Sequence, residues 1–206
     1  MHRNTLRYQL NEYFRIWIDS DISYPSLCPK KSSEIFTDVM QFIDTDSRCF
    51  DNDNPVGSIT GSALVVSWNM TKVLLTLHTK LNRWLQLGGH SDGSGDTHLV
   101  AMREAKEESG LSKVRFAEYE RALGYDRDHI PFDIDIHTIP KIGKTPEHLH
   151  FDVRYLLFAS PDDTLAITSE SRDLAWHTIK KARNIGDKFV FRCTLNTYFF
   201  HKGNTK

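Results

Sequence analysis

The sequence of 206 residues contains only three cysteines, Cys28, Cys49 and Cys193, and no Cys-x-x-Cys pair. An odd number of scattered cysteines argues against a disulfide framework and favours reduced thiols, which are typical of the cytosol. No window approaches 18 uninterrupted apolar residues, and the first residues lack the apolar core of a signal peptide. We therefore expect a soluble, cytoplasmic protein that does not interact with membranes.

An excess of charge of either sign is also missing. The 26 lysines and arginines nearly balance the 27 aspartates and glutamates, so no overall field favours a nucleic acid or an anionic membrane as a partner. The length suits one domain with a sizeable core and an appended element.

The first part of the chain is predicted to be helical. Apolar residues recur at spacings of three and four within residues 4–19 and again within 33–43, which is typical of amphipathic helices. A linker is expected between them at 24–29. We predict that residues 1–57 form a helical extension, either packed on the rest of the protein or used as a homodimer contact, and alternatively a substrate lid.

The apolar pattern changes to a period of two after residue 58. Residues 62–68 and 71–78 are predicted to form a hairpin around Asn69-Met70, and 83–87 a short strand that leads into a loop at Gly88-Gly89. This second part, 58–206, is predicted to be a single domain.

A helix is predicted from Thr97 to Ser109. Asp96 or Thr97 can cap its start, and Gly110 suits the left-handed position beyond its end. Leu99, Ala101, Met102 and Ala105 are expected to supply its apolar surface.

Helical spacing places Glu104, Glu107 and Glu108 on one face, with Arg103 one turn before Glu107. Three clustered carboxylates repel one another unless a cation offsets their charge, and hard oxygen ligands suit Mg²⁺ or Mn²⁺. The alternative is a solvated charged helix face.

The residues from Arg103 to Leu111, REAKEESGL, resemble the second half of the Nudix box, R-E-U-x-E-E-x-G-U with U aliphatic. Gly89 falls on the leading glycine of that box. The resemblance implies an α/β/α sandwich with a mixed sheet that hydrolyses a nucleoside diphosphate linked to another moiety. It further implies that Glu104, Glu107 and Glu108 bind Mg²⁺ or Mn²⁺, that Arg103 orients them, and that Gly88 and Gly89 lie at the substrate.

One position departs from the box. The leading glutamate of the pattern falls on Gly95, flanked by Asp92 and Asp96, either of which could supply a carboxylate. A non-catalytic module that binds a nucleotide or a partner protein is therefore the alternative to an enzyme.

Histidines form a second group of interest. Strand-like alternation places His148, His150 and Asp152 on one face, and His137 lies in a neighbouring alternating segment. These side chains could bind a transition metal as part of a different kind of hydrolase, contact substrate phosphates, or simply form hydrogen bonds. We predict substrate contacts for His148 and His150.

Near the end of the chain, Glu170 begins a segment, ESRDLAW, that resembles the E-S-x-x-x-x-W segment before the last helix of Nudix proteins. The resemblance makes Glu170 a candidate general base. The alternative is an acid that stabilises a helix start. A final packed helix is expected at 189–200.

Overall fold

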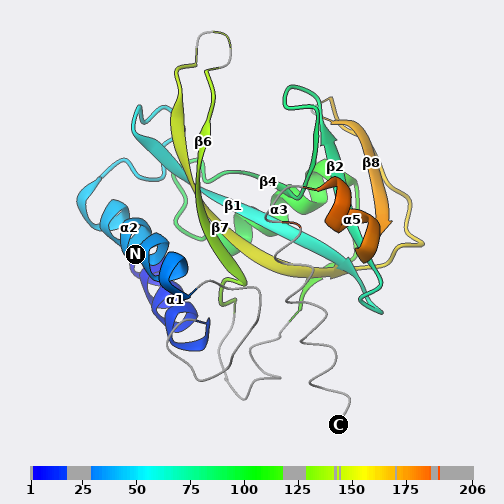
Figure 1. Ribbon diagram of the computed structural model, residues 1–206, viewed down its shortest axis with the longest axis horizontal. Helices are drawn as coiled ribbons and strands as arrows, with labels where there is room; N and C mark the ends of the chain where they lie inside the picture. The colour runs from blue at the N-terminus through cyan, green and yellow to red at the C-terminus, as the bar shows by residue number, and fades with distance from the viewer. Residues whose placement is uncertain are drawn as a thin grey trace.

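The computed structural model describes residues 2–17, 29–117, 129–141, 143, 145–169, 171–186 and 190. Its elements, in chain order, are α1 (His2–Trp17), α2 (Pro29–Thr45), β1 (Gly57–Ser67), β2 (Lys72–His78), β3 (Arg83–Leu85), β4 (Leu87–His90), α3 (Thr97–Ser109), β5 (Val114–Phe116), β6 (Asp133–Ile139), β7 (His148–Ala159), β8 (Ser171–Thr178) and α5 (Ile179–Ile185). Figure 1 shows them as a curled sheet with helices packed against it.

All described strands belong to one mixed sheet. Its main path runs β3-β2-β1-β7-β5, while β4 pairs with β1, β6 with β7 and β8 with β2. The long strands β1 and β7 are parallel, with Gly57 opposite Leu149 and Ser67 opposite Ala159. Every residue of β1 is buried, as expected for a strand covered on both faces. The prediction of an α/β fold with a mixed sheet is confirmed.

The two faces of β7 have different roles. Phe151 stacks on Phe42 of α2 at 4.0 Å between ring centroids, and the Tyr155 hydroxyl lies 2.7 Å from that of Thr97 in α3. His150, Asp152 and Arg154 alternate with these residues and therefore face the other way. The helices α2 and α3 thus cover one face, and the polar side chains lie on the opposite face.

Helix α3 packs closely on the sheet because β1 carries a glycine beneath it. A Cβ at Gly61 would lie 2.6 Å from the carbonyl oxygen of Thr97. The helix has the predicted bounds, and Gly110 has the predicted left-handed conformation, with φ of 72°. Leu99 was expected on the apolar side, but it is 56% exposed. Val100 is buried instead of Leu99, because Val100 is on the side of the helix that faces Gly61.

Other predicted boundaries differ from the structure. The segment 83–87 is not one strand, because β3 pairs with β2 and β4 pairs with β1. The pair Gly88-Gly89 lies within β4 and not in a loop. The segment beginning at Ser171 forms the strand β8 before the helix α5. Other predictions lie outside the described residues: Glu170, the helix at 189–200 apart from Val190, and the linker at 24–29 apart from Pro29, which begins α2.

No helix among the described residues is both long and apolar enough to cross a membrane. Cys49, the one cysteine within the described ranges, is a buried free thiol. Burial raises the pKa of this thiol to about 11.

Candidate active site

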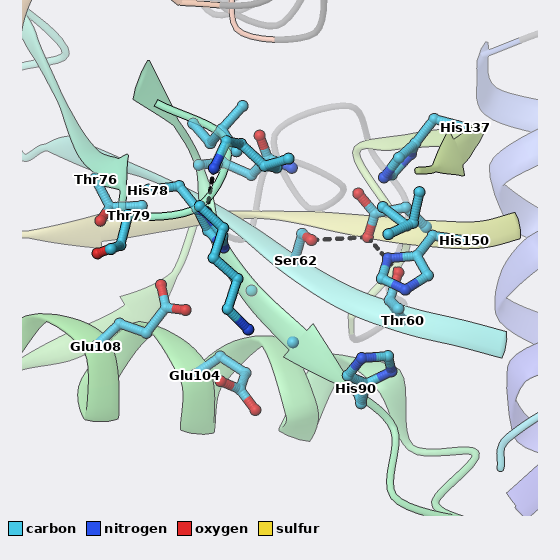
Figure 2. Close-up of a pocket in the computed structure, with 18 of the residues that line it drawn as sticks. Thr60, Ser62, Thr76, His78, Thr79, His90, Glu104, Glu108, His137 and His150 are labelled. Atoms are coloured by element: carbon cyan, nitrogen blue, oxygen red, sulfur yellow. Dashed lines mark hydrogen bonds between the residues drawn. The ribbon is translucent and has the colours of Figure 1, made fainter. Parts of the chain in front are cut away.

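A cavity of about 660 Å³ is lined by residues of α3, of the turn after β2 and of the polar face of the sheet (Figure 2). Helix α3 contributes Glu104 and Glu108 to its lining, and the sheet contributes hydroxyl and imidazole side chains. The sheet residues are Thr60, Ser62, Thr76, His78, His90, His137, His150 and Asp152. Helix α3, which carries the box residues, and the histidine-bearing strands β6 and β7 lie about 40 residues apart in the sequence. Both therefore line the same cavity.

Glu104 is seated against the backbone of β4. A Cβ on Gly89 would lie 2.5 to 2.7 Å from the carboxylate atoms of Glu104, so the absence of a side chain at Gly89 makes room for that carboxylate. The Glu104 side chain is only 16% exposed. Burial raises the pKa of its carboxyl group, while the hydrogen bond from Arg103 acts in the opposite direction.

Arg103 links the box helix to the strand before it. Its Nη2 donates to the carbonyl oxygen of His90 at 3.0 Å, to Asp92 at 3.1 Å and to Glu104 at 2.7 Å. These carboxylates, with the Glu104 hydrogen bond foremost, raise the pKa of Arg103. The guanidinium therefore restricts the position of the Glu104 carboxylate.

Asp92 lies closer to this arrangement than Asp96 does. Asp92 lines the cavity and pairs with Arg103, whereas Asp96 forms the N-cap of α3 through its backbone carbonyl and makes no capping bond with its side chain. Of the two aspartates flanking Gly95, Asp92 is thus the one that supplies a carboxylate at the cavity.

The three glutamates of the helix do not have equivalent positions. Glu108 points into the cavity (Figure 2) and Glu104 also lines it, while Glu107 is 64% exposed and lies 3.9 Å from the Nε atom of Arg103. Within the described part of the chain, no three or more His, Cys, Asp or Glu side chains form a group that could hold a metal ion as they stand. The expected convergence of three carboxylates is therefore seen for two of them.

Three imidazoles line the other end of the cavity. The ring of His150 lies 4.9 Å from that of His90 and 5.6 Å from that of His137, measured between centroids. His148 contacts His150 at 5.2 Å, but its Nδ1 lies 2.9 Å from the Pro146 carbonyl oxygen, and it is not among the residues that line the cavity. Burial, followed by repulsion from His90 and His137, lowers the pKa of His150 to about 3.

A buried charged network supports this end of the cavity. Arg154 donates to Asp152 at 2.6 Å, to Asp133 at 2.9 Å and to Asp135 at 3.2 Å. Asp152 also accepts hydrogen bonds from Thr60 at 2.9 Å and from Ser62 at 2.7 Å.

Arg154 and the β1 hydroxyls were not predicted from the sequence as parts of the site. The available signal was the same alternation that selected the histidines. Pairing of β6 with β7 places Asp133 opposite Arg154, Asp135 opposite Asp152 and His137 opposite His150.

The donor set of the cavity suits a hard divalent cation. Glu104 and Glu108 supply carboxylate oxygens, and the space above Gly89 that a Cβ would fill is occupied by the Glu104 carboxylate. The lining contains four carboxylates, and Lys80 is the only lysine or arginine among the described residues that line it. The positive charge of a divalent cation would therefore favour binding of an anionic ligand beside these carboxylates.

The sequence matches no protein-family model and no curated protein. Solved structures do match the fold. A Nudix-family hydrolase from Clostridium perfringens aligns over 69% of this chain and 97% of its own, with 23% identity and a TM-score of 0.51.

Two further structures have a TM-score of 0.50 and cover 97% of their own chains. One is an Ap4A hydrolase from C. elegans in a binary complex, 16% identical over 70% of this chain. The other is the E. coli dihydroneopterin triphosphate pyrophosphohydrolase, 12% identical over 72% of this chain. These likenesses show that the chain has the Nudix fold.

Proposed function

We propose that the protein is a Mg²⁺- or Mn²⁺-dependent hydrolase that cleaves the diphosphate bond of a nucleoside diphosphate linked to another moiety. The observation that carries this proposal is the joint placement of Glu104 and Glu108 in one cavity, with Glu104 seated on Gly89 and held by Arg103. The three structural neighbours described above carry the names of hydrolases, two of them of phosphorylated nucleotide-type compounds.

Each residue has a distinct role in the proposed reaction. Glu104 and Glu108 would hold the cation, with Glu107 joining from the rim of the cavity. Arg103 fixes the direction of the Glu104 carboxylate, and the backbone at Gly88 and Gly89 approaches the substrate. Bound Mg²⁺ or Mn²⁺ would neutralise phosphate oxygens and acidify water. Glu170 remains the candidate base on the resemblance of its segment alone.

Charge makes the cation necessary for this function. A diphosphate is an anion, and the described lining offers it one lysine against four carboxylates. Without a divalent ion, substrate and cavity would repel each other at distances where a Coulomb term amounts to about 1–4 kcal/mol per pair. We therefore expect substrate binding and turnover to require the metal.

A non-catalytic binding module is the second candidate. Gly95 stands where the box has its leading glutamate, and the described residues contain no ready-made group of three metal-ligating side chains. A cavity of this size could still bind a nucleotide without cleaving it.

The two candidates differ in a turnover assay. The full chain is incubated with Mg²⁺ or Mn²⁺ and a panel of dinucleotide polyphosphates, ADP-ribose, NADH and nucleoside triphosphates, and phosphate-containing products are measured. We expect cleavage of at least one compound. Glu104→Gln and Glu108→Gln should each lower kcat/KM by about 100-fold or more, equivalent to about 3 kcal/mol.

Glu34→Gln is the matched control, because Glu34 is exposed on α2. This substitution removes one carboxylate without touching the cavity and should leave turnover unchanged. Binding of panel members without any product would favour the non-catalytic module, and full activity of both cavity variants at saturating Mg²⁺ would refute the assigned roles.

A further inference from the structure

The histidine end of the cavity is distinct from the glutamate end. His90 comes from β4, His137 from β6 and His150 from β7, and Figure 2 shows them on the opposite side of the cavity from Glu108. A ligand whose diphosphate lies at the glutamates would extend toward these imidazoles. We call His90, His137 and His150 the imidazole cluster.

Two nitrogen atoms of the imidazole cluster are buried without a hydrogen-bond partner. They are Nδ1 of His137 and Nε2 of His150. Buried polar atoms of this kind normally have partners, so these two leave the hydrogen bonding of the cavity wall incomplete. A ligand with several oxygen atoms can satisfy both nitrogens together.

The neighbouring charges favour protonated imidazoles. Asp135 and Asp152 lie opposite each other on β6 and β7, directly beside His137 and His150. Together with Asp133 they supply three carboxylates to the single guanidinium of Arg154. From β1, the Ser58 hydroxyl lies 3.3 Å from Nδ1 of His90, and the Thr60 hydroxyl donates to Asp152 beside the cluster.

Burial and the other imidazoles, including His148 outside the cavity, oppose protonation. They lower the pKa of His150 to about 3, although Asp152 acts in the opposite direction. His150 is therefore uncharged at neutral pH when the cavity is empty. An anion placed beside this ring would offset the repulsion from its neighbours, and a proton taken from solvent would then remain on His150.

We propose that His137 and His150, supported by His90, bind a phosphate monoester that the substrate carries outside the cleaved diphosphate, and that His150 gains a proton on binding it. This inference rests on the proposed function for the identity of the substrate, but the binding step stands by itself. Phosphate supplies the acceptor oxygens that two imidazole N–H donors need. A sugar hydroxyl could fill the same space without any proton uptake.

The first test uses inorganic phosphate as the probe and the full-length Glu108→Gln variant in EDTA, which removes any contribution of a metal at the glutamates. Ring resonances of the histidines are followed by NMR during the titration, and proton uptake is measured by calorimetry in two buffers of different ionisation enthalpy. We expect the His137 and His150 signals to shift with a Kd of about 10 mM or lower, with measurable proton uptake.

Histidine variants test whether the imidazole cluster is responsible for phosphate binding and proton uptake. His137→Gln and His150→Gln should each weaken phosphate binding by about tenfold or more and remove the proton uptake. His98→Gln is the matched control: His98 is a half-buried imidazole, with its pKa lowered to about 4 chiefly by burial, and it lies outside the cavity lining. The NMR titration of the two ring signals needs no histidine substitution, so a poorly folding variant does not prevent a decision.

A matched pair of ligands distinguishes a site for a phosphate group of the substrate from a site for free phosphate. AMP and adenosine differ by one phosphate monoester, and we expect AMP to bind more tightly than both adenosine and inorganic phosphate, with proton uptake. Equal binding of AMP and inorganic phosphate would identify a free-phosphate site and overturn the substrate assignment.

Other outcomes also overturn the inference. Unchanged ring signals in about 50 mM phosphate would do so, as would stoichiometric Zn²⁺ binding that depends on His137 and His150 without phosphate binding. Failure of the proposed hydrolase function is separate, since it would appear as phosphate binding without turnover of any compound in the panel.

Discussion

The Asp152 carboxylate contributes both to the stability of the fold and to the wall of the cavity. Burial by itself raises the pKa of this group. The charge of Arg154, followed by the influence of His137 and the hydrogen bonds from Ser62 and Arg154, outweighs burial, so its pKa lies below the usual value. Asp152 is therefore charged throughout the neutral range and holds Arg154 and the β1 hydroxyls beneath the imidazole cluster.

Replacing this carboxylate should destabilise the protein in a pH-dependent way. Asp152→Asn leaves Arg154 with less compensating charge in a buried position, and we expect a loss of about 3–5 kcal/mol in the free energy of unfolding at pH 7. A group with a depressed folded-state pKa contributes stability above its unfolded pKa, about 3.9, and loses that contribution as the pH falls through the lower folded value.

Urea unfolding of the wild type and Asp152→Asn from pH 7 to pH 3 measures this difference. It should stay constant above about pH 5 and shrink below about pH 4. Asp162→Asn, which changes an exposed aspartate in the turn after β7, is the control and should leave stability nearly unchanged. A difference that stays constant down to pH 3 would show that Asp152 is not stabilised in its charged form.

At the scale of elements, local signals in the sequence were sufficient for the box helix but not for the strand before it. Helix α3 was predictable because its capping and its glycine stop are local, and Gly110 adopts the expected left-handed conformation. Strand β4 was not, because its pairing with β1 joins Gly88 to Ser62 and Gly89 to Gly61, over 25 residues away. Consecutive glycines suggest a loop unless such a partner is known.

The residues of the cavity also divide into those that local sequence patterns predict and those that depend on long-range pairing. Alternation along β7 predicted that His150 and Asp152 share a face, and both line the cavity. It could not predict that Arg154 would meet Asp133 and Asp135, because that contact depends on the register of β6 against β7. The parallel pairing of β1 with β7, about 90 residues apart, was equally beyond local patterns.

Strand β4 and helix α3 meet at two glycines with different expected effects. Gly89→Ala would place a methyl group at 2.5 to 2.7 Å from the Glu104 carboxylate, which is the far end of a side chain and can move aside. We therefore expect a stability loss of at most about 1 kcal/mol, together with a fall in kcat/KM of about tenfold or more because Glu104 leaves its position. Thermal unfolding and steady-state kinetics measure the two effects.

Gly61→Ala is the matched comparison. Its methyl group would lie 2.6 Å from the Thr97 carbonyl oxygen and 2.9 Å from Val100 Cβ, where the helix backbone itself must shift. This variant should lose about 1–3 kcal/mol of stability. Similar stability losses in the two variants, with activity of Gly89→Ala intact, would contradict the assignment of Gly89 as the seat of Glu104.

At the scale of the whole molecule, the N-terminal helices share the core of the sheet. Leu6 and Leu10 of α1 and Ile43 of α2 are fully buried in the same cluster as residues of β1 and β7. Gln9 of α1 also lies 3.5 Å from His98 of α3. We therefore propose that the extension at residues 1–57 is a packed part of the protein and that it unfolds together with the domain at 58–206.

Phe42 provides the test of this proposal, because its ring stacks on Phe151 with an interplanar angle of 8°. Phe42→Ala should cost about 3–5 kcal/mol, as is usual for a buried phenylalanine. In hydrogen exchange the loss should appear equally in amides of α1, α2, β1 and β7, since a cooperative unit opens as a whole. Tyr8→Ala, at a position on α1 that is 44% exposed, is the control and should have little effect. Faster exchange confined to α1 and α2, with β1 and β7 unchanged, would mean that the helices open separately, so that their contact with Phe151 is not needed to hold the polar face of β7 in place.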